Sequence, residues 1–169
     1  MKKLFHIIIS LQLSFVLFGC AGSKNIVQED DVPTDSKEHP KALEVVKIAR
    51  SKIGTKYKYG GIDRKGLDCS GLVYTTYSEL RIDMPRSSSA QSHVGKRVYI
   101  GELQRGDLIF FGAKPRSKKI THVGIVSYSK NGRVKMIHSS SSRGVIEDEV
   151  DKIYWTPRYI RASRPLVKK

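Results

Sequence analysis

The hydrophobic period of the chain changes near its middle, and this change constrains the fold more than any other feature. Apolar residues first recur at three- and four-residue steps, as on one face of an α-helix: Ala42, Val45, Val46, Ala49 and Ile53. From about residue 107 onward, short runs rich in β-branched and aromatic residues are separated by Gly, Ser, Lys and Asn, a pattern typical of strands. Helices followed by strands predict an α+β domain in which N-terminal helices pack on an antiparallel β-sheet.

The same patterns give approximate bounds for the elements. A first helix is expected over residues 41–53 and ends at Gly54. A second begins after Asp68, which is a suitable N-cap, and cannot continue far beyond Pro85. A short third helix is expected around residues 88–93, and strands are expected over residues 107–111, 121–128, 133–139, 145–147 and 159–163.

The N-terminal segment resembles a bacterial lipoprotein signal. Two lysines follow Met1, residues 4–18 are mostly apolar, and Gly19 precedes Cys20. Such a signal implies cleavage before Cys20 and lipidation of its thiol. A transmembrane anchor is the alternative, but it needs about 20 apolar residues, whereas this run has 15 and contains His6 and Gln12.

The chain therefore divides into three expected parts. Residues 1–19 form a signal peptide, residues 20–39 a lipidated cysteine with a polar, flexible tether, and residues 40–169 a single folded domain. We expect a monomer that is exported and held at a membrane through its lipid, facing the periplasm or the cell surface. The outer membrane is the expected site of the anchor.

Charge is distributed unevenly between these parts. Residues 20–39 carry a net charge of −3, whereas residues 40–169 carry +16, with 27 Lys and Arg against 11 acids. A surface this basic attracts nucleic acid, anionic lipid or an acidic wall polymer, and a general solubility charge remains the alternative. Because an exported protein rarely meets DNA, no nucleic-acid partner is expected.

Cys69 is the residue best suited to covalent chemistry. If Cys20 is lipidated, Cys69 has no cysteine with which to form a disulfide. A helix capped by Asp68 would place Cys69 in the first turn, where free N–H groups and the helix dipole lower the pKa of a thiol. The alternative is a buried, inert thiol.

Two histidines lie in predicted strands, where each is either a packed core residue or a partner of the thiol. His122 and His138 are separated by a turn signal at residues 129–132, and the sum of their numbers is even. In an antiparallel hairpin the residue numbers of every directly opposed pair have the same sum, and this sum is even only if the loop has an odd number of residues. His122 and His138 therefore face each other only if the loop is odd in length, as with Ser129 to Asn131, or if a bulge at Gly132 makes the sum even. We predict such a loop or bulge, with His122 paired to Cys69 and His138 orienting His122. His39 and His93 lie in polar segments and are expected to be solvated.

Six short motifs follow one another along residues 41–165. They are Gly54-Thr-Lys-Tyr57-Lys-Tyr59-Gly60-Gly61, Asp68-Cys69-Ser70-Gly71, Met84-Pro85-Arg86-Ser87, Gly106-Asp107-Leu-Ile-Phe-Phe111, His122-Val-Gly-Ile125 and His138-Ser. Together they resemble the NlpC/p60 family of cysteine peptidases, and within it the Spr-like lipoprotein branch. Met84, where the family more often has leucine, and the serine run at residues 139–142 are departures from the pattern.

The resemblance implies a papain-like fold for the domain and hydrolysis of peptidoglycan stem peptides or cross-links next to D-amino acids or meso-diaminopimelate. It makes Cys69 the nucleophile, His122 the general base and acid, and His138 the third polar residue. The residues implied in substrate binding or oxyanion stabilisation are Tyr57, Asp68, Ser70, Arg86 and Ser87. Neither a metal nor a cofactor is implied.

Two other functions remain open from the sequence. One is a catalytically idle, lipid-anchored protein that binds the wall, and the other is a thiol amidase or acyltransferase on the same fold. The complete set of Cys69, His122 and His138 favours the peptidase. The bond that is cut stays open.

Overall fold

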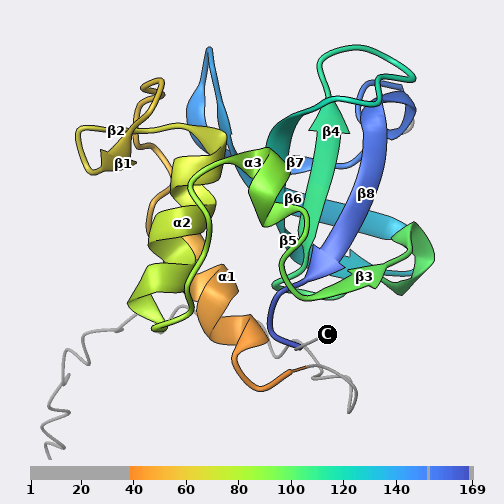
Figure 1. Cartoon of the computed structure of the whole chain (residues 1–169), viewed down its shortest axis with the longest axis horizontal. Coiled ribbons are helices and arrows are strands. Elements are labelled where there is room, and N and C mark those ends of the chain that lie inside the picture. The colour runs from red at the N-terminus through yellow and green to blue at the C-terminus, as the bar shows by residue number, and fades with distance from the viewer. Residues whose placement is uncertain (1–38, 152, 168–169) are drawn as a thin grey trace, which may run out of the picture. The chain divides into compact units, whose positions relative to one another are not determined.

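The computed structural model describes residues 39–151 and 153–167, which form helices packed against a six-stranded sheet (Figure 1). The helices are α1 (Ala42–Arg50), α2 (Cys69–Glu79) and α3 (Ser88–Gln91), and a small hairpin joins β1 (Ile62–Asp63) to β2 (Gly66–Leu67). The large sheet contains β3 (Lys96–Val98), β4 (Leu108–Gly112), β5 (Ile120–Lys130), β6 (Arg133–Ser140), β7 (Gly144–Glu149) and β8 (Tyr159–Arg164). Its order is β3-β8-β4-β5-β6-β7 and every neighbouring pair is antiparallel. The predicted α+β class is confirmed.

The predicted signal peptide, Cys20 and the tether up to residue 38 lie outside the described residues. Within the described part of the chain, no helix has the length and apolar character needed to cross a membrane.

Helix α1 forms as predicted but ends three residues early. Its apolar face is buried, whereas Ile53 is 46% exposed and takes no part in the core. After Arg50 the chain tightens into i→i+3 hydrogen bonds, and the Gly54 N–H then donates to the Val145 carbonyl of β7 at 2.9 Å. Because Gly54 adopts a φ of +90°, this bond to the sheet turns the chain out of the helix.

Helix α2 begins where the capping signal predicts. The Asp68 carboxylate accepts the Gly71 N–H at 2.6 Å, so Cys69 is the first helical residue. Gly71 lies so close to the preceding loop that a Cβ there would stand 2.0 Å from the Gly61 carbonyl oxygen. The start of α2 is therefore fixed both by its cap and by direct contact with the backbone of that loop.

The sheet buries apolar side chains on both faces because successive strand residues point in opposite directions. In β4, Leu108 and Phe110 pack with the residues of α1 and α2, whereas Ile109 and Phe111 pack into a second cluster on the other face. Trp155 and other residues outside the helices cover this second cluster.

The β5–β6 hairpin brings the two strand histidines to one face by a different route from the one predicted. Asn131 and Gly132 both have positive φ and form a strict two-residue turn, so that Lys130 pairs with Arg133. The predicted odd loop or bulge at Gly132 is therefore wrong. The extra residue lies inside β5, between Val126 and Tyr128. The residue numbers of two paired residues add up to 263 beside the turn, as for Lys130 and Arg133, and to 262 beyond the bulge, as for Val126 and Met136. That parity puts His122 and His138 on one face, offset by two positions instead of directly opposed.

A buried ion pair ties the start of β4 to β8. Asp107 is 1% exposed, and its two carboxylate oxygens accept hydrogen bonds from Arg164 at 2.8 and 2.9 Å. The same carboxylate accepts the Gln104 N–H at 2.8 Å. The adjacent Gly106 carbonyl accepts the hydroxyl of Tyr77 from α2. This group of contacts holds the helices and the sheet in one arrangement.

We predict that Asp107→Ala lowers the free energy of unfolding by about 3–5 kcal/mol, because it leaves the Arg164 guanidinium without its carboxylate. Urea unfolding followed by circular dichroism measures this change. The exposed pair Arg133–Glu149 supplies the control, since Arg133→Ala is expected to leave the urea midpoint almost unchanged. A midpoint in Asp107→Ala equal to that of the control would contradict the structural role of Asp107.

Candidate active site

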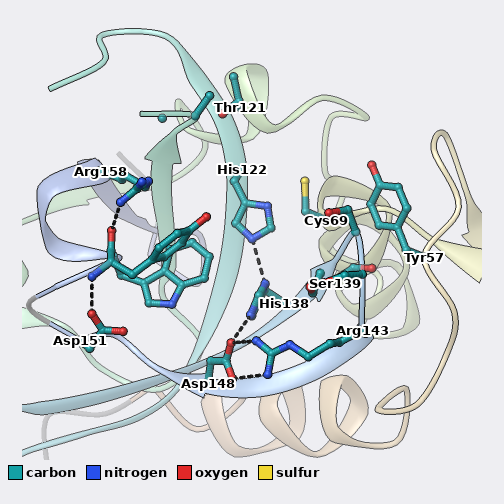
Figure 2. Close-up of a pocket in the computed structure, with 17 residues that line it drawn as sticks. Tyr57, Cys69, Thr121, His122, His138, Ser139, Arg143, Asp148, Asp151 and Arg158 are labelled. Carbon is teal, nitrogen blue, oxygen red and sulfur yellow. Dashed lines mark hydrogen bonds and ion pairs between the residues drawn. The ribbon is translucent and has the colours of Figure 1, made fainter. Parts of the chain in front are cut away.

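A cavity of about 520 Å³ opens where the start of α2, the ends of β4 to β7, Asp151 and residues 153–158 meet. Cys69, His122 and His138 all line it (Figure 2). The structure thus brings together the three residues that the sequence proposes for catalysis, from one helix and two neighbouring strands.

Cys69 is partly exposed in this cavity, and its thiol is not activated in the way the sequence suggested. Burial raises the pKa of the Cys69 thiol above its ordinary value, and the charge of Asp68 raises it further. Hydrogen bonds from backbone N–H groups, first that of Val123 and then those of Ser70 and Cys69, oppose this increase only in part. The predicted lowering of the thiol pKa is therefore wrong, and the thiol is protonated at neutral pH.

A line of hydrogen bonds runs from His122 into the protein (Figure 2). His122 Nε2 lies 3.0 Å from His138 Nδ1, and His138 Nε2 lies 3.2 Å from a carboxylate oxygen of Asp148. That same oxygen, Oδ2, accepts a hydrogen bond from Arg143 at 2.6 Å. Hydrogen bonds from Arg143 and His138 outweigh the effect of burial and lower the pKa of Asp148, so this carboxylate is ionised and acts as an acceptor.

Both imidazoles in this line are neutral at neutral pH. Burial, together with a smaller effect of the neighbouring His138, lowers the pKa of His122 to about 3. Burial also lowers the pKa of His138, although its bond to Asp148 opposes the change. The two rings are therefore uncharged, and each has one N–H and one lone pair.

The acceptor at the end of the line decides where both protons lie. Asp148 can only accept, so His138 carries its proton on Nε2 and offers the lone pair of Nδ1. His122 must then donate from Nε2, which leaves its Nδ1 with a free lone pair. Figure 2 shows Cys69 on the other side of the His122 ring from His138. His122 is thus held in the tautomer that can take a proton from the thiol.

Trp155 covers the two histidines. Its indole stacks on the His122 ring at 5.4 Å and 22°, and meets the His138 ring edge-on at 5.1 Å and 80°. It also packs against Phe111 at 4.7 Å. The indole therefore supplies much of the apolar surface that separates the histidine pair from water, and this desolvation is the main cause of the low pKa of His122.

The five residues implied in substrate or oxyanion binding occupy two kinds of position. Tyr57 lines the cavity on the Cys69 side (Figure 2). Asp68, Ser70 and Arg86 instead bind one another beside the start of α2: Arg86 donates to Asp68 at 2.7 and 3.1 Å and to Ser70 at 2.9 Å. Ser87 accepts the Ala90 N–H as the N-cap of α3. Only Tyr57 among the five is part of the cavity wall.

Asp148, Arg143 and Trp155 were not among the site residues predicted from the sequence. A usable signal existed for Asp148, since Ile146 pairs with His138 and Asp148, two residues further along β7, faces the same side of the sheet. This signal depends on the register of β6 with β7, which the sequence does not give. No pattern distinguished Trp155 from an ordinary packed aromatic residue.

Comparison with known proteins places this geometry in a family. Residues 54–164 match the model of the NlpC/P60 family. The chain is 36% identical over 113 residues to a probable endopeptidase NlpC homologue of Haemophilus influenzae, covering 66% of this chain and 56% of that protein. It is 39% identical over 114 residues to the murein DD-endopeptidase MepS/murein LD-carboxypeptidase of Escherichia coli, covering 67% and 57% of the two chains. The aligned region thus spans little more than half of either relative.

Solved structures agree with this assignment. An NlpC/P60 family protein from Bacillus cereus matches with a TM-score of 0.68 and 32% identity, over 76% of this chain and 41% of that one. The NlpC/p60 domain of the peptidoglycan hydrolase SagA matches with a TM-score of 0.60 and 26% identity, over 72% and 97% of the two chains. The chain belongs to the NlpC/P60 family.

Proposed function

We propose that this protein is a cysteine peptidase that hydrolyses peptide bonds of peptidoglycan, in stem peptides or cross-links, next to D-amino acids or meso-diaminopimelate. The observation that carries the proposal is that Cys69 and His122 line one open cavity, with hydrogen bonds running from His122 through His138 to Asp148. The names of the relatives support the substrate, since they include a murein DD-endopeptidase, a bifunctional muramidase/DL-endopeptidase and a γ-D-glutamyl-L-lysine dipeptidyl-peptidase.

Acylation follows from the neutral resting state. As the Cys69 sulfur attacks the carbonyl carbon, the thiol proton passes to Nδ1 of His122. The resulting imidazolium is stabilised through His138 by the negative charge of Asp148, and backbone N–H groups at the start of α2 stabilise the oxyanion. His122 then gives the proton to the leaving amine, and the C–N bond breaks to form a thioester on Cys69.

Deacylation reuses the same residues. A water molecule attacks the thioester carbon while His122 Nδ1 takes one of its protons. Collapse of the second tetrahedral intermediate breaks the C–S bond, and His122 returns the proton to the sulfur. The products are a peptide carboxylate and the regenerated thiol. An idle, wall-binding protein would have no use for an intact proton path of this kind, which favours the enzyme.

We also propose that the protein is exported as a monomeric lipoprotein, anchored through Cys20 to the outer membrane. The lipoprotein-like signal over residues 1–20 supports the anchor. A wall substrate requires a location outside the cytoplasm, and the +16 charge of residues 40–169 suits the anionic carboxylates of stem peptides.

Catalysis is tested by digesting purified muropeptides and identifying the products by mass. Cys69→Ala is expected to reduce product formation by about 10³-fold or more, because the variant lacks the sulfur on which the acyl intermediate forms. Cys20→Ala provides a matched cysteine control and is expected to keep full activity on soluble muropeptides. Equal product from the wild type and Cys69→Ala would exclude Cys69 from the reaction.

The anchor is tested by fractionating cells that express the full chain. The wild type is expected in the membrane fraction and to be labelled by an alkyne fatty acid, whereas Cys20→Ala loses both properties. A wild type that is not labelled, or a Cys20→Ala variant that still carries the label, would contradict a lipid anchor at this residue.

The pH dependence of kcat/KM tests the neutral histidine pair. Trp155→Ala exposes His122 to water, so the pKa of His122 rises from about 3 toward 6.5. The base is then protonated at higher pH, and the acidic limb of the profile should move upward by on the order of one unit or more. Trp155→Phe keeps an apolar ring over His122 and should leave the limb near its wild-type position. An unchanged limb in Trp155→Ala would show that the indole does not set this pKa.

A further inference from the structure

Arg158 places a positive charge at the end of the cavity away from Cys69, and this charge takes no part in the proposed reaction. Tyr57 lies on the Cys69 side of His122, and Arg158 lies on the far side (Figure 2). Arg158, Tyr154 and Asp151 line the cavity together with Trp155, which is close to them in the sequence. A substrate that reaches Cys69 can therefore extend past His122 toward Arg158.

Arg158 is held in place by its own segment. Its NH1 donates to the Tyr154 carbonyl at 2.7 Å, and its guanidinium lies over the Tyr154 ring at 4.0 Å from the centroid. Its Nε is buried and has no hydrogen-bond acceptor among the residues that the structure describes. Burying an N–H group without a hydrogen bond is energetically unfavourable, so the surrounding contacts must fix this side chain in position. Arg158 therefore differs from a solvated surface arginine that moves freely.

The turn beneath Arg158 is also braced. The Asp151 carboxylate accepts the N–H groups of Ile153, at 2.8 Å, and Tyr154, at 2.5 Å. The Thr156 hydroxyl donates to the Asp151 carbonyl at 2.8 Å. Because Trp155 in this turn stacks on His122, the position of Arg158 is fixed relative to the catalytic base.

The two arginines that line the cavity differ in their pairing. Arg143 binds both carboxylate oxygens of Asp148. Arg158 forms no ion pair with any carboxylate in residues 39–151 and 153–167. Asp151, the other acid nearby, already accepts backbone N–H groups of its own turn. Arg158 is therefore a fixed cation that forms no ion pair with the carboxylates that line the cavity.

We propose that Arg158 binds a carboxylate of the substrate, so that the enzyme selects stem peptides with a free carboxylate over those in which it is amidated. A guanidinium presents parallel N–H donors that match a carboxylate, whereas a carboxamide of the same shape has no charge and only one acceptor oxygen. The inference rests on the proposed peptidase function, and it adds the chemical group that determines which substrates are preferred.

The test uses two synthetic stem peptides that differ only in a free carboxylate or a carboxamide at residues next to the cut bond. The wild type is expected to show a kcat/KM about tenfold or more higher for the carboxylate peptide, mainly through KM. Arg158→Gln should bring this ratio close to one while turnover of the carboxamide peptide stays within about twofold of wild type. Arg158→Lys keeps the charge without the fork and should give an intermediate ratio.

Arg116→Gln supplies the matched control, because Arg116 is exposed in the loop between β4 and β5 and does not line the cavity. It should retain the wild-type ratio. A wild type that cleaves both peptides equally, or an Arg158→Gln variant that keeps the preference or loses both activities alike, would overturn the role of Arg158. A wild type that cleaves neither peptide would instead contradict the proposed function, and the inference with it.

Discussion

The hydrogen bond between His122 and His138 is the interaction on which the rest of the site depends. Two neutral imidazoles 3.0 Å apart bind each other only if one donates and the other accepts. Asp148 decides which, because an ionised carboxylate must accept from His138. The charge of Asp148, acting through His138, therefore determines which ring nitrogen of His122 has the free lone pair. The hydrogen bond from Arg143 keeps Asp148 ionised. Burial under Trp155 keeps both rings uncharged, which preserves this order of protons.

The fold positions the two halves of this chemistry independently. Cys69 is placed by the helix start, where Asp68 caps α2 and Gly71 lies against the preceding loop. The histidines are placed by the register of β5 with β6, which a bulge inside β5 shifts by one residue. Without that bulge a two-residue Asn131-Gly132 turn would put the two rings on opposite faces of the sheet. The packing of α1 and α2 on the sheet joins the two halves into one cavity.

The sequence predicted the elements well but the detailed connections between them poorly. Periodicity located α1, α2 and five of the six strands of the large sheet, because each has enough apolar residues to show a pattern; α3 was expected near its place without such a pattern. It missed β3, in which Lys96 and Arg97 at a sheet edge leave only Val98 buried, and the two-residue strands β1 and β2. The numbering of the two histidines showed that they share a face of the sheet only with a bulge or an odd loop, but it could not show where the extra residue lies. The raised pKa of the Cys69 thiol was also beyond prediction, since burial outweighs the effect of the helix start only once the neighbouring strands are in place.

The position of the protons in the histidine line is the claim most open to direct measurement. Nitrogen NMR of protein carrying ¹⁵N-histidine, recorded at neutral pH and assigned with a His138→Gln variant, reports the protonation of each ring nitrogen. We expect His122 to be protonated at Nε2 and unprotonated at Nδ1, with His138 also protonated at Nε2 alone. A His122 ring protonated at both nitrogens would mean a preformed thiolate–imidazolium pair, and a proton on Nδ1 alone would leave no base facing Cys69. Either result would contradict this mechanism.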